Sequence, residues 1–222
     1  MNERLLTGIG MTSARTRDRL VQHLRSAGIE DELVLERIRT VPRHVFVDEA
    51  LASHAYEDKV LPLGYGQTIS QPYVVALMTA GLIRRKTKLD KVLEIGTGCG
   101  YQTAVLAPFV RHIYSVERIR PLLTRAQQTL RQLKINNVSL RHADGWRGWR
   151  SQAPYDGILV AAAPERVPQE LLEQLDQDGR LLIPVGRSGS QSLLCITRRG
   201  TEFHEREITA VSFVPLVEGT EL

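Results

Sequence analysis

The residues best suited to hold a ligand form a strand–turn–helix pattern at residues 91–107 (KVLEIGTGCGYQTAVLA). A hydrophobic run at 92–95 predicts a buried strand, and residues 101–107 predict a helix. Between them stand three alternate glycines, Gly96, Gly98 and Gly100. Glycine lets the backbone turn sharply and lets a ligand approach without meeting a Cβ atom, and a helix start offers unpaired N–H groups. The pattern is typical of a nucleotide-type cofactor site.

The glycine spacing and the charge beside it indicate which ligand fits. The spacing G-x-G-x-G differs from the G-x-G-x-x-G expected for a pyrophosphate. Glu94, two residues before Gly96, would repel a diphosphate but would favour a cationic ligand. S-adenosylmethionine has a sulfonium, an ammonium and no phosphate, so it suits this turn. For the motif alone, a tight structural turn between a buried strand and a helix is the alternative interpretation.

Two further acidic residues are expected at the same edge of the sheet, because ligands of open parallel sheets bind at the carboxyl ends of the strands. Glu117 ends the next predicted strand, 21 residues after the first glycine, the interval at which a carboxylate meets ribose hydroxyls. Asp144 follows the third strand and is a candidate acceptor for an adenine amino group, with Gly145 letting its backbone come close. Trp146 and Ile119 are candidates for stacking on the base, although a large aromatic residue after a strand usually belongs to the core.

The elements that must position these residues alternate between strand and helix. Strands are predicted at 112–117, 138–142, 155–160 and 180–184, and helices at 101–107, 119–133 and 167–175. Such alternation predicts a parallel sheet with helices on both faces. Strand-like runs at 192–197 and 207–214, joined through a turn at Gly200, predict a terminal antiparallel pair. The expected fold class is therefore α/β.

An N-terminal helical layer is expected before the sheet. Helices are predicted at 12–27, 31–40 and 43–53. The apolar residues of the second helix are expected to face inward; they are Leu33, Val34, Leu35 and Ile38. We expect the 222 residues to form one domain, with a helical subregion at 1–60 and a cofactor-binding core at 90–222.

The uncharged stretch at 60–71 (VLPLGYGQTISQ) differs from both of its neighbours. Its proline and glycines predict irregular structure, and its position just before the cofactor strand makes it a candidate wall of the site. Ser70 precedes an apolar helix predicted at 74–83, with Pro72 in the first turn. Ser70 is expected to cap that helix, to contact a substrate, or both, because a helix N-terminus also attracts carboxylates.

Composition narrows the class of protein. Hydrophobic content of 42% and charged content of 24% are ordinary for a globular chain, and the net charge is +4. Basic residues gather only at 84–88 and in the arginine series at 15–25, without interleaved aromatic residues, so nucleic-acid binding is not expected. Cys99, Cys195 and the histidines lack the spacing of a disulfide framework or a metal site. With no signal peptide or membrane-spanning run, we expect a cytoplasmic protein.

Several segments together resemble the bacterial type of protein-L-isoaspartate (D-aspartate) O-methyltransferase, and the resemblance covers nearly the whole chain. The segments are VPRHVFV (41–47), LPLGYGQTIS (61–70), VLEIGTGCG (92–100), ADGW (143–146), QLDQDGRLLIPVG (174–186) and FVPL (213–216). The glycine motif is shared by many methyltransferases, whereas G-Q-T-I-S is specific to this family. Cys99 and Ala143 stand where the family often has Ser and Gly, and both are small.

The resemblance implies a class I, Rossmann-like methyltransferase that uses S-adenosylmethionine and releases S-adenosylhomocysteine. Its substrate would be the free α-carboxylate of L-isoaspartyl (and D-aspartyl) residues in damaged proteins, and the ester would close to a succinimide that partly hydrolyses to aspartate. Ser70 corresponds to the family's active-site residue. The implied cofactor contacts are Gln67, Thr68, Gly96, Thr97, Gly98, Glu117, Asp144 and Gly145. The implied substrate contacts are Thr68, Ile69, Ser70, Val214, Pro215 and Leu216.

Other functions stay open on sequence grounds. A methyltransferase acting on RNA or a small molecule would share the glycine turn and Glu117 but would have no need of residues 61–70. A non-catalytic relative that binds altered peptides would keep the fold and lose cofactor residues, and a nicotinamide dehydrogenase is disfavoured by the glycine spacing. We expect a monomer without a metal ion that acts on peptides and proteins, not on nucleic acid or a membrane.

Overall fold

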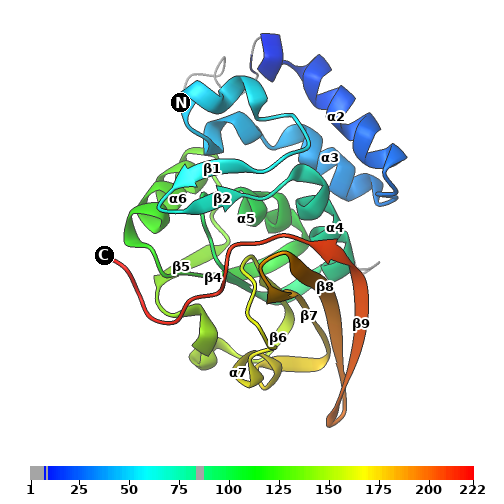
Figure 1. Ribbon diagram of the computed structural model, residues 1–222, viewed down its shortest axis with the longest axis vertical. Coiled ribbons are helices and arrows are strands. Elements are labelled where there is room, and N and C mark those ends of the chain that lie inside the picture. Colours follow the sequence, from blue (N-terminus) through cyan, green and yellow to red (C-terminus); the bar gives the residue numbers. More distant parts are fainter. Residues whose placement is uncertain (1–7, 9, 84–87) are drawn as a thin grey trace.

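The framework of the protein is a seven-stranded sheet with the order β5-β4-β3-β6-β7-β8-β9 (Figure 1). The computed structural model describes residues 8, 10–83 and 88–222. The strands are β3 (Leu89–Ile95), β4 (Val110–Glu117), β5 (Val138–His142), β6 (Tyr155–Val160), β7 (Leu175–Arg187), β8 (Ser190–Arg199) and β9 (Glu202–Val211). Neighbours from β5 to β7 pair in parallel, and β8 pairs antiparallel with both β7 and β9. The predicted α/β sheet with a terminal antiparallel pair is confirmed.

The strand order reverses at β3. From β3 the sheet adds β4 and β5 on one side and β6 and β7 on the other. At such a reversal the loops after the two central strands leave in opposite directions, and a crevice opens at the carboxyl ends of the strands. The glycine turn follows β3, and residues 161–163 follow β6, so both loops border this crevice.

Alternate strand residues serve two cores, as the period of two in a strand requires. Val92 belongs to the larger cluster and Leu93 to the smaller one. The helices that contribute to the larger cluster include α4 (Pro72–Ile83), α5 (Tyr101–Leu106) and α6 (Arg120–Gln132). The smaller cluster is covered in part by α7 (Gln169–Leu172). The helix predicted at 167–175 is thus only one turn long, because the chain enters β7 at Leu175.

The N-terminal layer consists of α2 (Ala14–Ser26) and α3 (Glu32–Thr40), which lie outside the sheet (Figure 1). Asp31 caps α3, since its side chain accepts from Leu33 N and Val34 N at 3.1 Å each. The predicted helix at 43–53 is wrong: the chain forms two 3₁₀ segments there, Arg43–Phe46 and Glu49–His54, and a further one at Gly10–Thr12. Leu33 is 68% exposed and not inward-facing, because it lies in the first turn on the outer side of the helix.

Residues 60–71 form a hairpin and not the irregular loop that the sequence predicts. The strands β1 (Leu61–Gly64) and β2 (Gln67–Ile69) pair antiparallel around Tyr65 and Gly66, whose φ angles are 54° and 66°. Two consecutive positive φ angles are the pattern of a tight type I′ turn, whose twist suits a hairpin. Leu61, Leu63 and Ile69 are buried, which holds the hairpin against the body of the protein.

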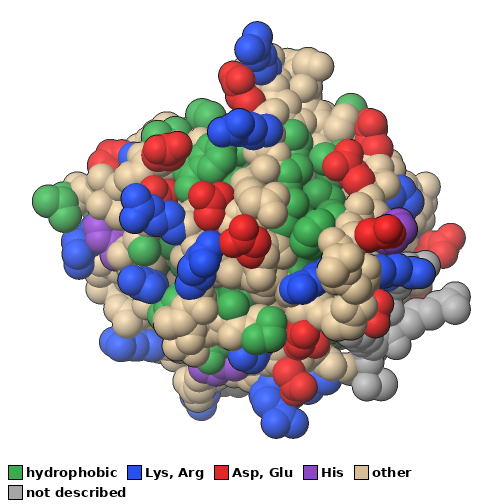
Figure 2. Space-filling model, turned by 90° about the horizontal axis from the view of Figure 1, so that it is seen from below, with side chains coloured by type: hydrophobic (Ala, Val, Ile, Leu, Met, Phe, Trp, Pro, Cys, Tyr) green, Lys and Arg blue, Asp and Glu red, His purple; other side chains and the backbone are tan. Residues whose placement is uncertain are grey.

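Two sequence observations fall on residues outside the described part of the chain. They are the N-terminal residues 1–7 and 9, used for the absence of a signal peptide, and residues 84–87 of the basic cluster. Among the described residues no helix combines the length and the apolar character needed to cross a membrane. On the face shown in Figure 2, basic and acidic side chains stand side by side with apolar areas between them.

Candidate active site

The glycine turn after β3 is tied to the neighbouring strand by its backbone. Gly96, Gly98 and Gly100 have φ angles of 88°, 54° and 89°, which side chains with a Cβ rarely adopt. Gly96 N donates to Val116 O at 2.8 Å. Gly96, Thr97 and Gly98 line a cavity at the crevice where the strand order reverses. The structure therefore places the predicted turn at the predicted edge of the sheet.

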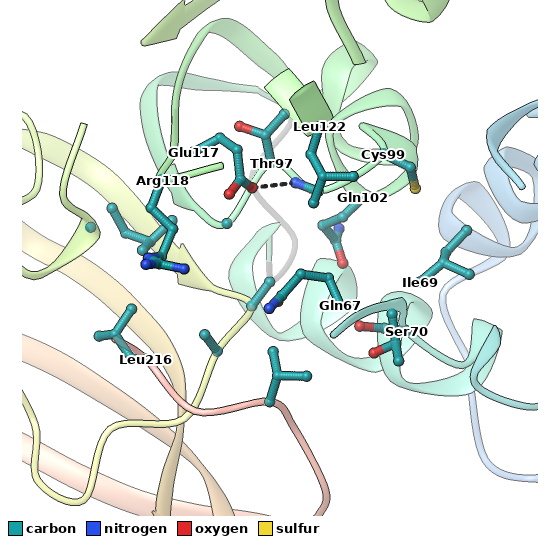
Figure 3. A pocket seen from close by; sticks show the side chains of 18 of the residues that line it. Gln67, Ile69, Ser70, Thr97, Cys99, Gln102, Glu117, Arg118, Leu122 and Leu216 are labelled. Atoms are coloured by element: carbon teal, nitrogen blue, oxygen red, sulfur yellow. Dashed lines mark hydrogen bonds between the residues drawn. The ribbon is translucent and has the colours of Figure 1, made fainter. Parts of the chain in front are cut away.

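Glu117 ends β4 with a carboxylate that two backbone amides orient. Oε2 accepts from Gly98 N at 2.8 Å (Figure 3), and Oε1 accepts from Ile119 N at 2.9 Å. Glu117 lines the cavity and is only 5% exposed. Each carboxylate oxygen has a second lone pair, so the group can still accept hydrogen bonds from ligand hydroxyls. Glu117 thus lies where the sequence predicts a partner for a ribose. We call residues 96–98 and Glu117 the turn wall.

Glu94 lies beneath the turn and does not line the cavity. It is fully buried, and Oε2 accepts from Thr103 Oγ1 at 2.5 Å and from Ser115 Oγ at 2.6 Å. Burial raises the pKa of Glu94 to about 7, against the opposing effect of these two hydroxyls. Strand alternation directs the side chain toward α5, so Glu94 joins β3, β4 and α5.

Asp144 also lies outside the lining of the cavity. Its Oδ1 accepts from Trp146 N at 2.9 Å, and its Oδ2 accepts from Gly219 N at 3.0 Å. The carboxylate therefore caps a short 3₁₀ segment and holds the C-terminal part of the chain. Trp146 and Ile119, the candidates for stacking on the base, are not among the described residues that line the cavity. Each carboxylate oxygen keeps a second lone pair, so contact of Asp144 with an adenine amino group stays a prediction.

Gly145, in contrast, reaches the cavity as predicted. A Cβ atom at this position would lie 2.5 Å from Ile95 Cγ2, so only glycine permits this approach between the loop after β5 and the end of β3. Asp144 and Gly145 are adjacent in sequence, and Gly145 is the one that lines this cavity.

A second wall of the cavity comes from the hairpin β1–β2. Gln67, Thr68, Ile69 and Ser70 line the same cavity as the glycine turn. Figure 3 shows Gln67 and Ser70 across the cavity from Glu117. The structure therefore brings together two motifs that the sequence separates by some thirty residues, as the resemblance implies.

Ser70 is held through its backbone carbonyl, which accepts from Arg43 Nη2 at 2.8 Å. Tyr73 N, in the first turn of α4, donates to Asp58 Oδ1 at 2.7 Å. Asp58 therefore caps α4, the role that the sequence analysis considered for Ser70. Ser70 itself lies at the cavity.

The C-terminal segment supplies the remaining wall. After β9 it crosses the carboxyl ends of the strands, as the red trace of Figure 1 shows. Ala163 N donates to Val214 O at 2.8 Å, and Leu216 N donates to Ala163 O at 2.9 Å. This pairing puts Val214, Pro215 and Leu216 on the cavity. We call residues 67–70 and 214–216 together the loop wall.

Beyond Leu216 the segment is latched to the end of β4. Glu221 N donates to Arg118 O at 2.7 Å, and Arg120 N donates to Glu221 O at 3.0 Å. The Arg118 guanidinium forms an ion pair with Glu221, with Nη1 and Oε2 3.1 Å apart. The short C-terminus thus spans the site from β6 to β4, which the sequence alone did not indicate.

Several lining residues were missed by the sequence analysis. They are Val75, Ile95, Cys99, Tyr101, Gln102, Val116, Arg118, Leu122, Ala161, Ala162 and Val217. Ala161 and Ala162 follow β6, so the rule that ligands bind at strand ends would have found them. Cys99 is buried, and burial raises the pKa of its thiol to about 11, so it is not a nucleophile at neutral pH. Within the described chain, no three His, Cys, Asp or Glu side chains gather as a metal site requires.

The profile of one protein family matches almost the entire chain. It is described as protein-L-isoaspartate(D-aspartate) O-methyltransferase, and the match runs over residues 15–221. The chain belongs to this family. A protein-L-isoaspartate O-methyltransferase of Halorhodospira halophila is 56% identical over 219 residues, covering 99% of each chain. One of Alcanivorax borkumensis is 58% identical over 214 residues, covering 96% of this chain and 97% of the relative.

Solved structures of the same family share the fold. A protein-L-isoaspartate O-methyltransferase structure has a TM-score of 0.80 at 28% identity, covering 90% of this chain and 65% of that one. A Plasmodium falciparum protein described as a beta-aspartate methyltransferase has a TM-score of 0.79 at 24% identity, covering 90% and 98%. That structure is a complex with S-adenosyl-L-homocysteine. The predicted family and the predicted class I methyltransferase fold are both confirmed.

Proposed function

We propose that the protein transfers a methyl group from S-adenosylmethionine to the free α-carboxylate of L-isoaspartyl, and D-aspartyl, residues in damaged proteins and peptides. One observation supports this most directly: a single cavity is lined both by the turn wall and by Thr68, Ile69 and Ser70. Group transfer requires donor and acceptor to meet in one site. The substrate class follows from the family match over residues 15–221.

The cavity lining suits S-adenosylmethionine. Gly96 and Gly98 present no Cβ atom, Glu117 offers two oriented oxygens to hydroxyls, and Val116 and Leu122 offer apolar surface to a base. When bound, S-adenosylmethionine supplies the methyl group on a positively charged sulfur. The proposed cofactor contacts are Asp144 and seven residues that line the cavity: Gln67, Thr68, Gly96, Thr97, Gly98, Glu117 and Gly145. Asp144 also accepts from Gly219 N and so holds the C-terminal segment.

The proposed substrate contacts come from the loop wall and include Ser70. They are Thr68, Ile69, Ser70, Val214, Pro215 and Leu216. The Ser70 hydroxyl donates a hydrogen bond to one oxygen of the substrate carboxylate and so aims the other oxygen at the methyl group. Hydrogen bonds to a charged acceptor are stronger than neutral ones, which makes a hydroxyl sufficient for this task.

A carboxylate acceptor needs no general base from the protein. Its pKa is about 4, so it is already deprotonated at neutral pH. The O–CH₃ bond forms as the S–CH₃ bond breaks, the electron pair of the broken bond stays on sulfur, and no proton moves. Orientation and exclusion of water therefore account for most of the rate. The hairpin and the C-terminal segment provide both, since they close two sides of the cavity.

The decisive experiment uses methyl-labelled S-adenosylmethionine with an isoaspartyl peptide and its normal aspartyl twin. We expect base-labile label, released as methanol, in the isoaspartyl peptide only. The matched peptide controls for length, charge and every neighbouring residue. Label in RNA, or label in neither peptide, would overturn the proposal.

We further propose that the protein is a cytoplasmic monomer that acts on peptides and not on nucleic acid. Both cysteines, Cys99 and Cys195, are buried free thiols, which suits a reducing compartment. The large apolar side chains that are exposed come from separate parts of the chain, such as Leu33, Tyr65 and Phe203. Singly exposed apolar residues are normal for a monomer. Sedimentation velocity at micromolar concentration tests this: a dimer would contradict it.

A further inference from the structure

Arg43 is a buried cation directly behind the loop wall. It opens the 3₁₀ segment Arg43–Phe46, and its side chain is completely shielded from solvent. Desolvation lowers the pKa of Arg43, yet a guanidinium stays protonated in proteins. A full positive charge is therefore held inside the protein, where a charge costs much free energy unless it is paired.

The guanidinium touches two residues that line the cavity. Nη2 donates to Ser70 O at 2.8 Å, and Cζ lies 4.7 Å from the centre of the Tyr101 ring. Ser70 and Tyr101 both border the cavity, so the charge lies one residue behind its surface. The ring face is electron-rich and stabilises the cation in part.

The positive charge of Arg43 is not fully compensated by groups inside the protein. Among the described residues, Arg43 Nε and Nη1 have no hydrogen-bond partner, and the neighbours that favour its charge are Tyr101, Cys99 and Tyr56, with no carboxylate among them. Arg118, which lines the cavity, already pairs with Glu221. A buried arginine with an aromatic ring and a carbonyl as its neighbours lacks a counter-charge.

We infer that Arg43 is a positioning residue that holds Ser70 by its carbonyl and makes the site prefer an anionic peptide, because the substrate carboxylate at Ser70 supplies the missing negative charge. The inference rests on the proposed function, since it takes the carboxylate to bind beside Ser70. It also has a consequence for release of the methylated product. Methyl transfer converts the carboxylate to a neutral ester, so the attraction to Arg43 ends when the product forms.

The test compares an isoaspartyl peptide with its neutral α-carboxamide twin, each bound to protein saturated with S-adenosylhomocysteine. Neither can react, and fluorescence anisotropy gives the Kd of each. In the wild-type protein the carboxylate peptide should bind more tightly. In Arg43→Met the Kd of the carboxylate peptide should rise roughly 10- to 100-fold, as expected for two charges several ångströms apart at a protein interior's effective dielectric constant. The Kd of the carboxamide should rise less than about threefold.

Matched variants separate charge from structure. Arg43→Lys keeps the charge and should keep most of the preference for the carboxylate. Arg37→Met is the control, because Arg37 is partly buried and, like Arg43, donates from Nη2 to a backbone carbonyl. That carbonyl is Ala104 O, at 3.4 Å, and Ala104 does not line the cavity. The control variant should leave both Kd values unchanged. If the role of Arg43 were merely structural, Arg43→Met would weaken the binding of both peptides equally.

An unchanged ratio of the two Kd values in Arg43→Met overturns the inference. Should that variant not fold, equal binding of the two peptides by the wild-type protein overturns it as well. Either result leaves the proposed function standing if the wild-type protein methylates the isoaspartyl peptide. A wild-type protein that does not methylate the isoaspartyl peptide overturns the proposed function instead.

Discussion

The turn wall and the loop wall meet in one cavity but are built in different ways. The turn wall is held between two neighbouring parallel strands, by Gly96 N on Val116 O and by the Glu117 carboxylate on Gly98 N. The loop wall comes from segments before β3 and after β9, which are far apart in sequence. Its 214–216 part pairs through backbone groups with Ala163, and single side chains fasten Ser70 and Phe213. Arg43 holds Ser70 O, and the Gln191 amide bonds Phe213 N at 2.6 Å and Phe213 O at 3.1 Å.

This difference separates binding of the methyl donor from selection of the substrate. The turn wall follows from the pairing of β3 with β4 and suits any nucleoside-type donor. Side-chain fastenings can change one residue at a time, so the loop wall is where a substrate preference can be tuned. Variants on the two walls should therefore affect different measurements.

Glu117→Ala should break the turn wall alone, and it should have the largest effect. It leaves Gly98 N and Ile119 N without their acceptor, at a cost of about 1–3 kcal/mol for the buried Ile119 amide, and removes the proposed ribose contact. We expect the Kd of S-adenosylhomocysteine, measured by calorimetry, to rise more than about 100-fold. Glu173→Ala, at an exposed ion pair with Arg150, is the matched control. A Kd within threefold of wild type would show that Glu117 does not support the cofactor.

Glu94→Gln should change how the stability of the protein depends on pH, because Glu94 is buried beneath the turn wall. Burial raises the pKa of Glu94 to about 7, above its ordinary value of about 4.5 in the unfolded chain. Between these values the folded protein keeps a proton that the unfolded chain has lost, so this group's contribution to stability is complete below about pH 4.5 and is lost as pH rises through about 7. Gln cannot ionise. The stability of Glu94→Gln relative to wild type should therefore increase by roughly 3 kcal/mol from pH 4.5 to pH 8.

Urea unfolding of both proteins at pH 4.5, 6 and 8 measures this difference. Above pH 8 the two curves should run parallel, because Glu94 is then ionised in both the folded and the unfolded state. Parallel curves across the whole range would mean that Glu94 titrates normally in the folded protein.

Ser70→Ala should break the loop wall alone. Loss of one hydrogen bond to a charged group, about 1.5–3 kcal/mol, should lower kcat/KM for the isoaspartyl peptide roughly 10- to 100-fold. The Kd of S-adenosylhomocysteine should stay within about twofold, because the turn wall is intact. Ser192→Ala, whose hydroxyl bonds the exposed Glu207 on the antiparallel strands, should retain full activity. A fully active Ser70→Ala enzyme would remove Ser70 from the proposed mechanism.

Glu221→Ala should have the smallest effect, although Glu221 fastens the segment that joins both walls. The ion pair with Arg118 is partly exposed and is worth less than about 1 kcal/mol, while the backbone bonds from Glu221 to Arg118 and Arg120 remain. Stopped-flow dissociation of S-adenosylhomocysteine should accelerate less than about fivefold. Glu165→Ala, at the exposed pair with Arg187, should change nothing. An acceleration above tenfold would make this ion pair the main latch.

Much of the turn wall was predictable because its signals are local. Gly96 and Gly98 mark a backbone conformation that other residues rarely adopt, and the apolar run before them marks a buried strand. Strand–helix alternation then predicts that Glu117, at the end of its strand, lies at the same edge of the sheet as the glycine turn. The resemblance added Ser70 and residues 214–216, which lie far from the turn in sequence and meet it only in the fold.

The directions of individual side chains could not be predicted from the sequence. Glu94 and Asp144 stand at or near strand ends as predicted, but one points beneath the turn and the other toward Gly219 N. Strand position alone does not distinguish the two sides of a loop. The hairpin at 61–69 was missed because its pairing depends on a two-residue turn at Tyr65 and Gly66, not on an alternation of polar and apolar residues.

The sequence by itself determined the α/β sheet, the glycine turn and the family, since these follow from periodicity, from backbone preferences of glycine and from contiguous motifs. Only the tertiary structure decided which acidic residues reach the cavity, that Asp58 caps α4, and that Arg43 stands behind Ser70. These facts depend on contacts between residues distant in the chain. Such contacts are set by how the layers pack, and no local pattern encodes them.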